Sequence, residues 1–158
     1  MDRSNADSGL QQPKDGQTTE IRMAERVDCT PKASAMIDHL VAMHGPLLFH
    51  QSGGCCDGSA PMCYQRGEFK IGGRDVLLGI IHGATPVYIG GAQFEYWQHT
   101  RLTIDVVPGR GAGFSLEAPE GVRFLTRSRL FTDEESIEMV LAGPPLRGPA
   151  AAGLDEPT

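Results

Sequence analysis

The chain has 158 residues, of which 40% are hydrophobic and 22% are charged, and its formal net charge is −6. This composition is typical of a globular protein and excludes a fully disordered chain. The acidic balance argues against nucleic acid as a partner, because phosphate binding needs clustered Lys and Arg. No run approaches the roughly 18 apolar residues of a membrane span, and the N-terminus lacks the apolar core of a signal peptide. We therefore expect a cytoplasmic protein without a membrane partner.

The composition changes towards both ends of the chain. Residues 1–21 are rich in Asp, Gln, Ser, Gly and Thr without an apolar period, which predicts a disordered tail. Residues 143–158 are rich in Pro, Ala and Gly and predict a second disordered tail. Residues 22–142 then form a single β-rich domain, which is a common domain size.

The first predicted element is an amphipathic helix near the N-terminus. Thr30 is a favourable N-cap and Pro31 suits the first helical position. Gly45 and Pro46 end the helix. Its apolar face is formed by residues at helical spacing, namely Ala33, Met36, Ile37, Leu40 and Val41.

Short apolar or alternating runs follow. They predict strands at residues 47–49, 76–81, 86–89, 102–106, 113–117 and 122–127. Residues 94–99 fit either a short helix or an irregular stretch. Thr132 and Glu135 fit a capping box, which predicts a short C-terminal helix with Ile137, Val140 and Leu141 on its apolar face. The fold class is therefore mainly β (α+β), framed by these helices.

The residues best suited to metal binding or thiol chemistry lie in a cysteine-containing segment after the first predicted strand. Gly53 and Gly54 precede Cys55 and Cys56, and glycines allow close approach of the backbone to a ligand. Cys63 returns seven residues later. Soft sulfur ligands favour zinc, copper(I) or iron–sulfur clusters, so Cys55, Cys56 and Cys63 are candidate metal ligands. The alternative is that these thiols only pack in the core, and one of the adjacent pair can be a bystander.

Four polar residues are candidates to complete this site. His50 lies just upstream on the entering strand, and Asp57 directly follows the thiols. Each can bind a metal or orient a ligand. Asp57, His82 and His99 are the weaker candidates; a lone histidine is more often a hydrogen-bonded structural residue than a ligand.

The segment resembles a known family. The run Pro46-Leu47-Leu48-Phe49-His50-Gln51-Ser52-Gly53-Gly54-Cys55-Cys56-Asp57-Gly58-Ser59, followed by Pro61-Met62-Cys63-Tyr64, resembles a bacterial domain-of-unknown-function family. Its genes often lie beside aldehyde dehydrogenase genes. The resemblance covers roughly residues 31–131, and it implies an aldehyde or alcohol dehydrogenase as a partner but no particular reaction.

The order of features is also similar to that of the HesB-like A-type iron–sulfur carriers. The shared features are a helix, a strand into a Gly-Gly-Cys loop, an Ile-Asp strand, and a Gly-x-Gly-Phe segment before a turn with Pro. The resemblance implies a compact β-sandwich or pseudo-barrel with a packed helix. Those carriers end in Cys-x-Cys, whereas no cysteine follows Cys63 here. A cluster would need Cys55, Cys56 and Cys63, or thiols from two subunits of a homodimer.

Three functions remain open at this point. The first is an accessory protein that binds zinc, iron or an iron–sulfur cluster and assists an aldehyde or alcohol dehydrogenase. The second is a structural or chaperone-like partner whose cysteines pack. The third is a cysteine-nucleophile enzyme acting on aldehydes or thiol adducts, with His50 or His82 as its base.

Overall fold

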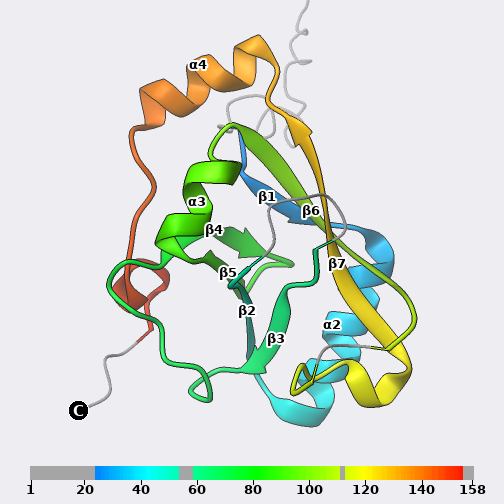
Figure 1. Cartoon of the computed structure of the whole chain (residues 1–158). Helices are drawn as coiled ribbons and strands as arrows, with labels where there is room; N and C mark the ends of the chain where they lie inside the picture. Colours follow the sequence, from blue (N-terminus) through cyan, green and yellow to red (C-terminus); the bar gives the residue numbers. More distant parts are fainter. Residues whose placement is uncertain (1–23, 54–58, 111–112, 155–158) are drawn as a thin grey trace, which may run out of the picture.

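A computed structural model describes residues 24–53, 59–110 and 113–154. This part of the chain forms an α+β fold with two mixed sheets and three α-helices (Figure 1). The predicted disordered tail over residues 1–21 lies outside the described residues. None of the described helices combines the length and the apolar character needed to cross a membrane.

The first sheet has three strands in the order β1-β6-β7. Strand β1 (Val27–Cys29) runs parallel to β6 (Thr100–Pro108), and β6 pairs antiparallel with β7 (Val122–Leu130). The second sheet has the order β3-β2-β5-β4. Strands β2 (Leu47–Gln51) and β5 (Thr85–Ile89) are parallel, while β3 (Met62–Gln65) and β4 (Val76–Ile81) pair antiparallel with them.

The larger apolar cluster of the described residues lies between the two sheets. Phe49 of β2 and Phe124 of β7 meet there edge to face, with 4.8 Å between ring centroids. Every residue of β2 and of β5 is buried, because a second cluster of Leu48, Ile71 and Tyr88 covers the outer face of this sheet. A strand covered on both faces has a continuous apolar run, which is the pattern that predicted these two strands.

The helix predicted after Thr30 is α2 (Pro31–His44). The Thr30 hydroxyl accepts a hydrogen bond from the N–H of Ala33 and donates to Asp105 of β6 at 2.8 Å. Burial raises the pKa of Asp105, but hydrogen bonds from Arg127, Thr30 and a backbone N–H outweigh it and hold the pKa below its usual value. The cap thus ties the start of α2 to the first sheet.

Residues 94–99 were predicted to be either a short helix or irregular. The structure has a helix there, α3 (Gly91–Trp97), which begins three residues earlier than predicted. The predicted strand at residues 113–117 is wrong. Residues 113–117 form turns that lead into a 3₁₀ turn, η2 (Ala118–Glu120), and Phe114 is 91% exposed. The buried side chains in this segment are the polar ones of Ser115 and Glu117. Their burial is possible because the Ser115 hydroxyl donates to Glu117 and accepts from the N–H of Cys63.

The segment for which a disordered tail was predicted, residues 143–158, is described over residues 143–154, which form turns beside β4. Arg147 pairs with Val76 of β4 in an isolated antiparallel β-bridge, and a 3₁₀ turn, η3 (Pro149–Ala152), follows. The buried hydroxyl of Tyr88 donates to the carbonyl of Gly148 at 2.7 Å. A buried hydroxyl needs such a partner, so this segment completes the second cluster. Residues 155–158 lie outside the described residues.

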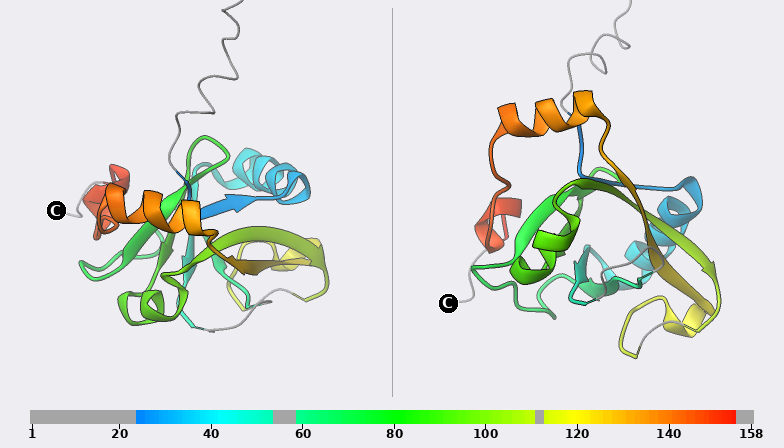
Figure 2. Two further views of the ribbon diagram at one scale, coloured as in Figure 1. Left: turned by 90° about the horizontal axis from the view of Figure 1, so that it is seen from above. Right: turned by 45° about the horizontal axis from the view of Figure 1, so that its top comes forward.

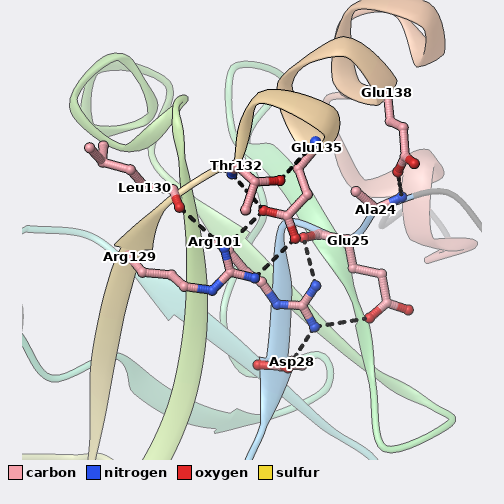
Figure 3. Close-up of polar contacts among 9 residues, drawn as sticks. All are labelled: Ala24, Glu25, Asp28, Arg101, Arg129, Leu130, Thr132, Glu135 and Glu138. Atoms are coloured by element: carbon pink, nitrogen blue, oxygen red, sulfur yellow. Dashed lines mark hydrogen bonds and ion pairs between the residues drawn. The ribbon is translucent and has the colours of Figure 1, made fainter.

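Helix α4 (Asp133–Ala142) confirms the predicted capping box, but not a packed apolar face. None of its ten residues is buried, and the side chains of Ile137, Val140 and Leu141 are exposed. Figure 2 shows α4 set apart from the sheets. Polar contacts hold it instead: Arg129 forms two hydrogen bonds with Glu135, and Glu138 accepts from the N–H of Ala24 (Figure 3).

This anchoring gives a pH-dependent prediction for α4. The hydrogen bonds from Arg129 and from the Thr132 N–H lower the pKa of Glu135 from 4.5 to about 2. Because the folded pKa is depressed, the contribution of Glu135 is complete above pH 4.5 and is lost as the pH falls towards 2. We expect the helical carbon chemical shifts of α4 to fade over this interval while those of β6 persist. If α4 were already lost at pH 6, the ionised Glu135 would not be the group that holds this helix.

Candidate functional site

The candidate site lies where β2 ends. Strands β2 and β5 are parallel and end side by side, and the N–H of Gly90 donates to the carbonyl of Gln51 at 3.2 Å. The exposed residues Ser52 and Gly53 then carry the chain away from the sheet. The candidate ligands Cys55, Cys56 and Asp57 follow in sequence and lie outside the described residues.

His50 is held on both sides of its ring. It is 4% exposed, its Nε2 lies 3.1 Å from Oδ1 of Asp75, and its Nδ1 lies 2.6 Å from Oγ of Ser52. An ionised carboxylate only accepts hydrogen bonds, so Nε2 of His50 carries a hydrogen; in the neutral imidazole, Nδ1 then carries the lone pair, which accepts from the hydroxyl of Ser52. The ring of Phe69 packs against the imidazole at 4.6 Å. The lone pair of the neutral His50 ring therefore lies on the side of Ser52.

Asp75 is itself fixed by the backbone. Its second oxygen, Oδ2, accepts from the N–H of Gly72 at 2.8 Å, which closes the turn before β4. This arrangement, in which a carboxylate orients an imidazole with its second ring nitrogen on the side of Ser52, can serve in two ways. It is the outer support of many metal-binding histidines, and it also orients a general base.

Cys63 lies in a different environment. Its side chain is fully buried in the core between the sheets. Burial, and then the nearby charge of Glu117, raise the pKa of the Cys63 thiol far above its usual value. Burial of this kind favours the protonated thiol, which is a poor nucleophile.

The pleat of the sheet separates Cys63 from His50. Cys63 pairs with Phe49, whereas His50 pairs with Met62. Successive side chains on a strand point to opposite faces, so Cys63 shares the inner face with Phe49 and His50 lies on the outer face. The structure does not bring these two candidate ligands together.

The two weaker histidines also lie elsewhere. His82 is in the turn between β4 and β5, at the opposite end of β5 from the site, where its Nε2 lies 2.7 Å from Asp38 of α2. His99 is exposed and follows α3. Within residues 24–53, 59–110 and 113–154, no three His, Cys, Asp or Glu side chains form a group that could hold a metal ion.

Two residues of this site were missed by the sequence interpretation. Ser52 lies two positions after His50, and this spacing is a signal that the two side chains share a face. Asp75 is 25 positions away and has no such signal, since only the fold brings it to His50. A glycine-rich turn just before a buried strand was the only local hint of its position.

Comparison with known proteins places this site within a family. A family model described as a domain of unknown function, DUF779, matches residues 36–130. The matched region is more than half of the chain and contains His50, Ser52 and Asp75. No curated protein matches the chain.

Proposed function

This chain belongs to the DUF779 family of domains of unknown function, and we propose that it is a metal-binding accessory protein that uses Cys55, Cys56 and His50 as ligands. The single observation that carries the proposal is the contact between His50 and Asp75. Metal-ligating histidines commonly donate their other ring N–H to a carboxylate, which fixes the tautomer and the ring orientation. In this chain, the imidazole so prepared precedes two adjacent cysteines by only five residues.

The donor set favours zinc. Thiolates and imidazole nitrogen are the usual ligands of zinc, and iron is also bound by these ligands. Nδ1 of His50 would exchange its hydrogen bond from Ser52 for the metal. Cys63 is not part of this proposal, because it faces the core. Asp57 or a ligand from a second copy would complete four-coordination.

The finer assignments of fold and partner belong to the same proposal. We propose that the fold is of the HesB-like type, which is supported by the order of α2, β2 with its glycines, and the Ile104–Asp105 strand. An aldehyde or alcohol dehydrogenase would be the protein that depends on the bound metal. The support for that partner is the family resemblance of the Gly-Gly-Cys-Cys-Asp-Gly segment.

Metal and sulfide analysis of the full chain purified without oxygen tests the proposal. We expect about one metal ion per chain or per pair of chains, and its loss from C55S, C56S and H50Q. A bound metal stabilises the folded state by a few kcal/mol, so a chelator should lower the melting temperatures of the wild type and of the control variant but not those of C55S, C56S and H50Q. Cys29→Ser is the matched control, because the thiol of Cys29 contacts the hydroxyl of Ser34 in α2 and is not one of the proposed ligands. Metal-free wild type, or equal metal in every variant, would overturn the proposal and favour a structural partner.

The same contact supports a second candidate, an enzyme in which His50 activates a cysteine nucleophile. A carboxylate that orients an imidazole is also the arrangement of a general base. In that case a thiol should react with iodoacetamide well below its unperturbed pKa of about 8.5, and H50Q should abolish the fast phase. A chelator separates the two candidates, because it exposes metal-bound thiols but leaves an activated thiol unchanged.

A further inference from the structure

A cavity of about 520 Å³ lies beside the beginning of α3. Three segments line it: the turn before β4, the first two turns of α3, and the C-terminal segment that follows α4. The lining residues are Arg74, Gly91, Ala92, Glu95 and Arg147. The volume falls within the range of about 300–1,000 Å³ typical of small-molecule sites.

Backbone contacts fix the positions of the two arginines. The C-terminal segment is joined to β4 by backbone contacts. The N–H of Leu77 donates to the carbonyl of Leu146, and Arg147 pairs with Val76 in an isolated β-bridge. Nη1 of Arg147 then donates to the carbonyl of Arg74 at 3.0 Å. The two cationic residues are therefore brought to one cavity by the fold and not by their neighbours in sequence.

Gly91 lets these segments approach one another. A Cβ at this position would lie 2.6 Å from the carbonyl oxygen of Arg74 and 3.2 Å from Nη1 of Arg147. The first distance is shorter than any real contact of this kind, so a larger residue would push the arginine-bearing segments away. The absence of a side chain here shapes the cavity wall.

The cavity is locally cationic in an acidic protein. Its two arginines and one glutamate give a formal charge of +1, by two minus one, whereas the whole chain carries −6. Neither guanidinium forms an ion pair with another described residue. Guanidinium groups bind carboxylates and phosphates through paired N–H donors.

We propose that this cavity binds a small organic anion through a carboxylate or phosphate group held between Arg74 and Arg147. Glu95 on the cavity wall accepts a hydrogen bond from a hydroxyl or amino group of the same ligand. The site uses none of the candidate metal ligands, so it stands or falls independently of the metal-binding proposal. It would give the protein a small-molecule ligand in addition to a metal.

The experiment follows the amide signals of Gly91 and Ala92 in the full chain by NMR during titration with phenyl phosphate, with benzoate, and with neutral benzyl alcohol. We expect saturable shifts with at least one of the anions and none with benzyl alcohol. Since a charge-assisted hydrogen bond contributes about 1.5–3 kcal/mol, R74Q should weaken binding at least ~10-fold. Which anion binds more tightly identifies the group that the ligand carries.

The matched control is Arg110→Gln, which changes the net charge equally at an exposed residue that does not line the cavity. R147Q should also lose binding, but it can loosen the C-terminal segment, so R74Q is the decisive variant and unchanged Leu77 shifts report an intact fold. The proposal is overturned if neither anion gives saturable shifts at Gly91 and Ala92. It is equally overturned if R74Q and R110Q weaken binding alike, or if benzyl alcohol binds as tightly as the anions.

Discussion

Replacing Phe124 with alanine should lower the free energy of unfolding by about 3–5 kcal/mol, the range for large aromatic residues in well-packed cores. Phe124 is fully buried, and its ring meets Phe49 edge to face across the space between the two sheets. The substitution removes both the buried area and the aromatic pair that joins β7 to β2. Chemical denaturation followed by circular dichroism measures the change as a lower midpoint at an unchanged slope.

Leu130 provides the matched control for this prediction, because it lies on the same strand and is 73% exposed. Leu130→Ala should change the free energy of unfolding by no more than about 0.5 kcal/mol. If F124A does not fold, Phe124→Leu keeps most of the volume and should still destabilise the protein measurably. Equal effects of F124L and L130A would show that the two sheets do not share one core.

The elements that could be predicted from the sequence have local signals. Helix α2 (Pro31–His44) is capped by Thr30 and Gly45, and these residue types mark helix ends through their side-chain and backbone chemistry. Strands β4, β5 and β6 could be recognised from their sequences, because the order of apolar and polar residues in a strand reflects which of its faces are buried. The capping box of α4 is likewise complete within four residues.

The elements that could not be predicted depend on distant partners. Residues 113–117 alternate like a strand, yet Ser115 and Glu117 are the buried ones because each finds a hydrogen-bond partner inside the protein. The C-terminal segment looks like a tail by composition, but the buried hydroxyl of Tyr88 and the edge of β4 fix it. Neither partner is visible in the local sequence.

The candidate site shows the same division. His50 was a candidate ligand from its position before the cysteines, and its imidazole does lie at the end of β2. Whether Cys63 could join it depended on the register of β2 and β3, which pairs Cys63 with Phe49 and not with His50. A shift of one residue would have put both on one face, and no local pattern reveals the register.

Asp75 is the residue through which the metal-binding proposal can be tested most sharply. Asp75→Asn is nearly isosteric and still offers an oxygen to the N–H of Gly72, so the turn before β4 should persist. The amide N–H₂ that the substitution introduces would donate to Nε2 of His50, which moves the imidazole hydrogen to Nδ1. The lone pair would then face this introduced amide instead of the side of Ser52 and the cysteines.

We therefore expect D75N to weaken zinc binding by about 10- to 100-fold, the usual effect of changing the partner of a ligating histidine. Competition with a chromophoric chelator measures the affinity, and nitrogen NMR of the imidazole reports the tautomer. Asp38→Asn is the matched control, because it makes the same change at the exposed pair of Asp38 and His82, at the other end of the sheet. If D75N switches the tautomer of His50 while zinc affinity stays equal to that of D38N, then His50 is not a ligand. The contact with Asp75 would then only join β2 to the turn before β4.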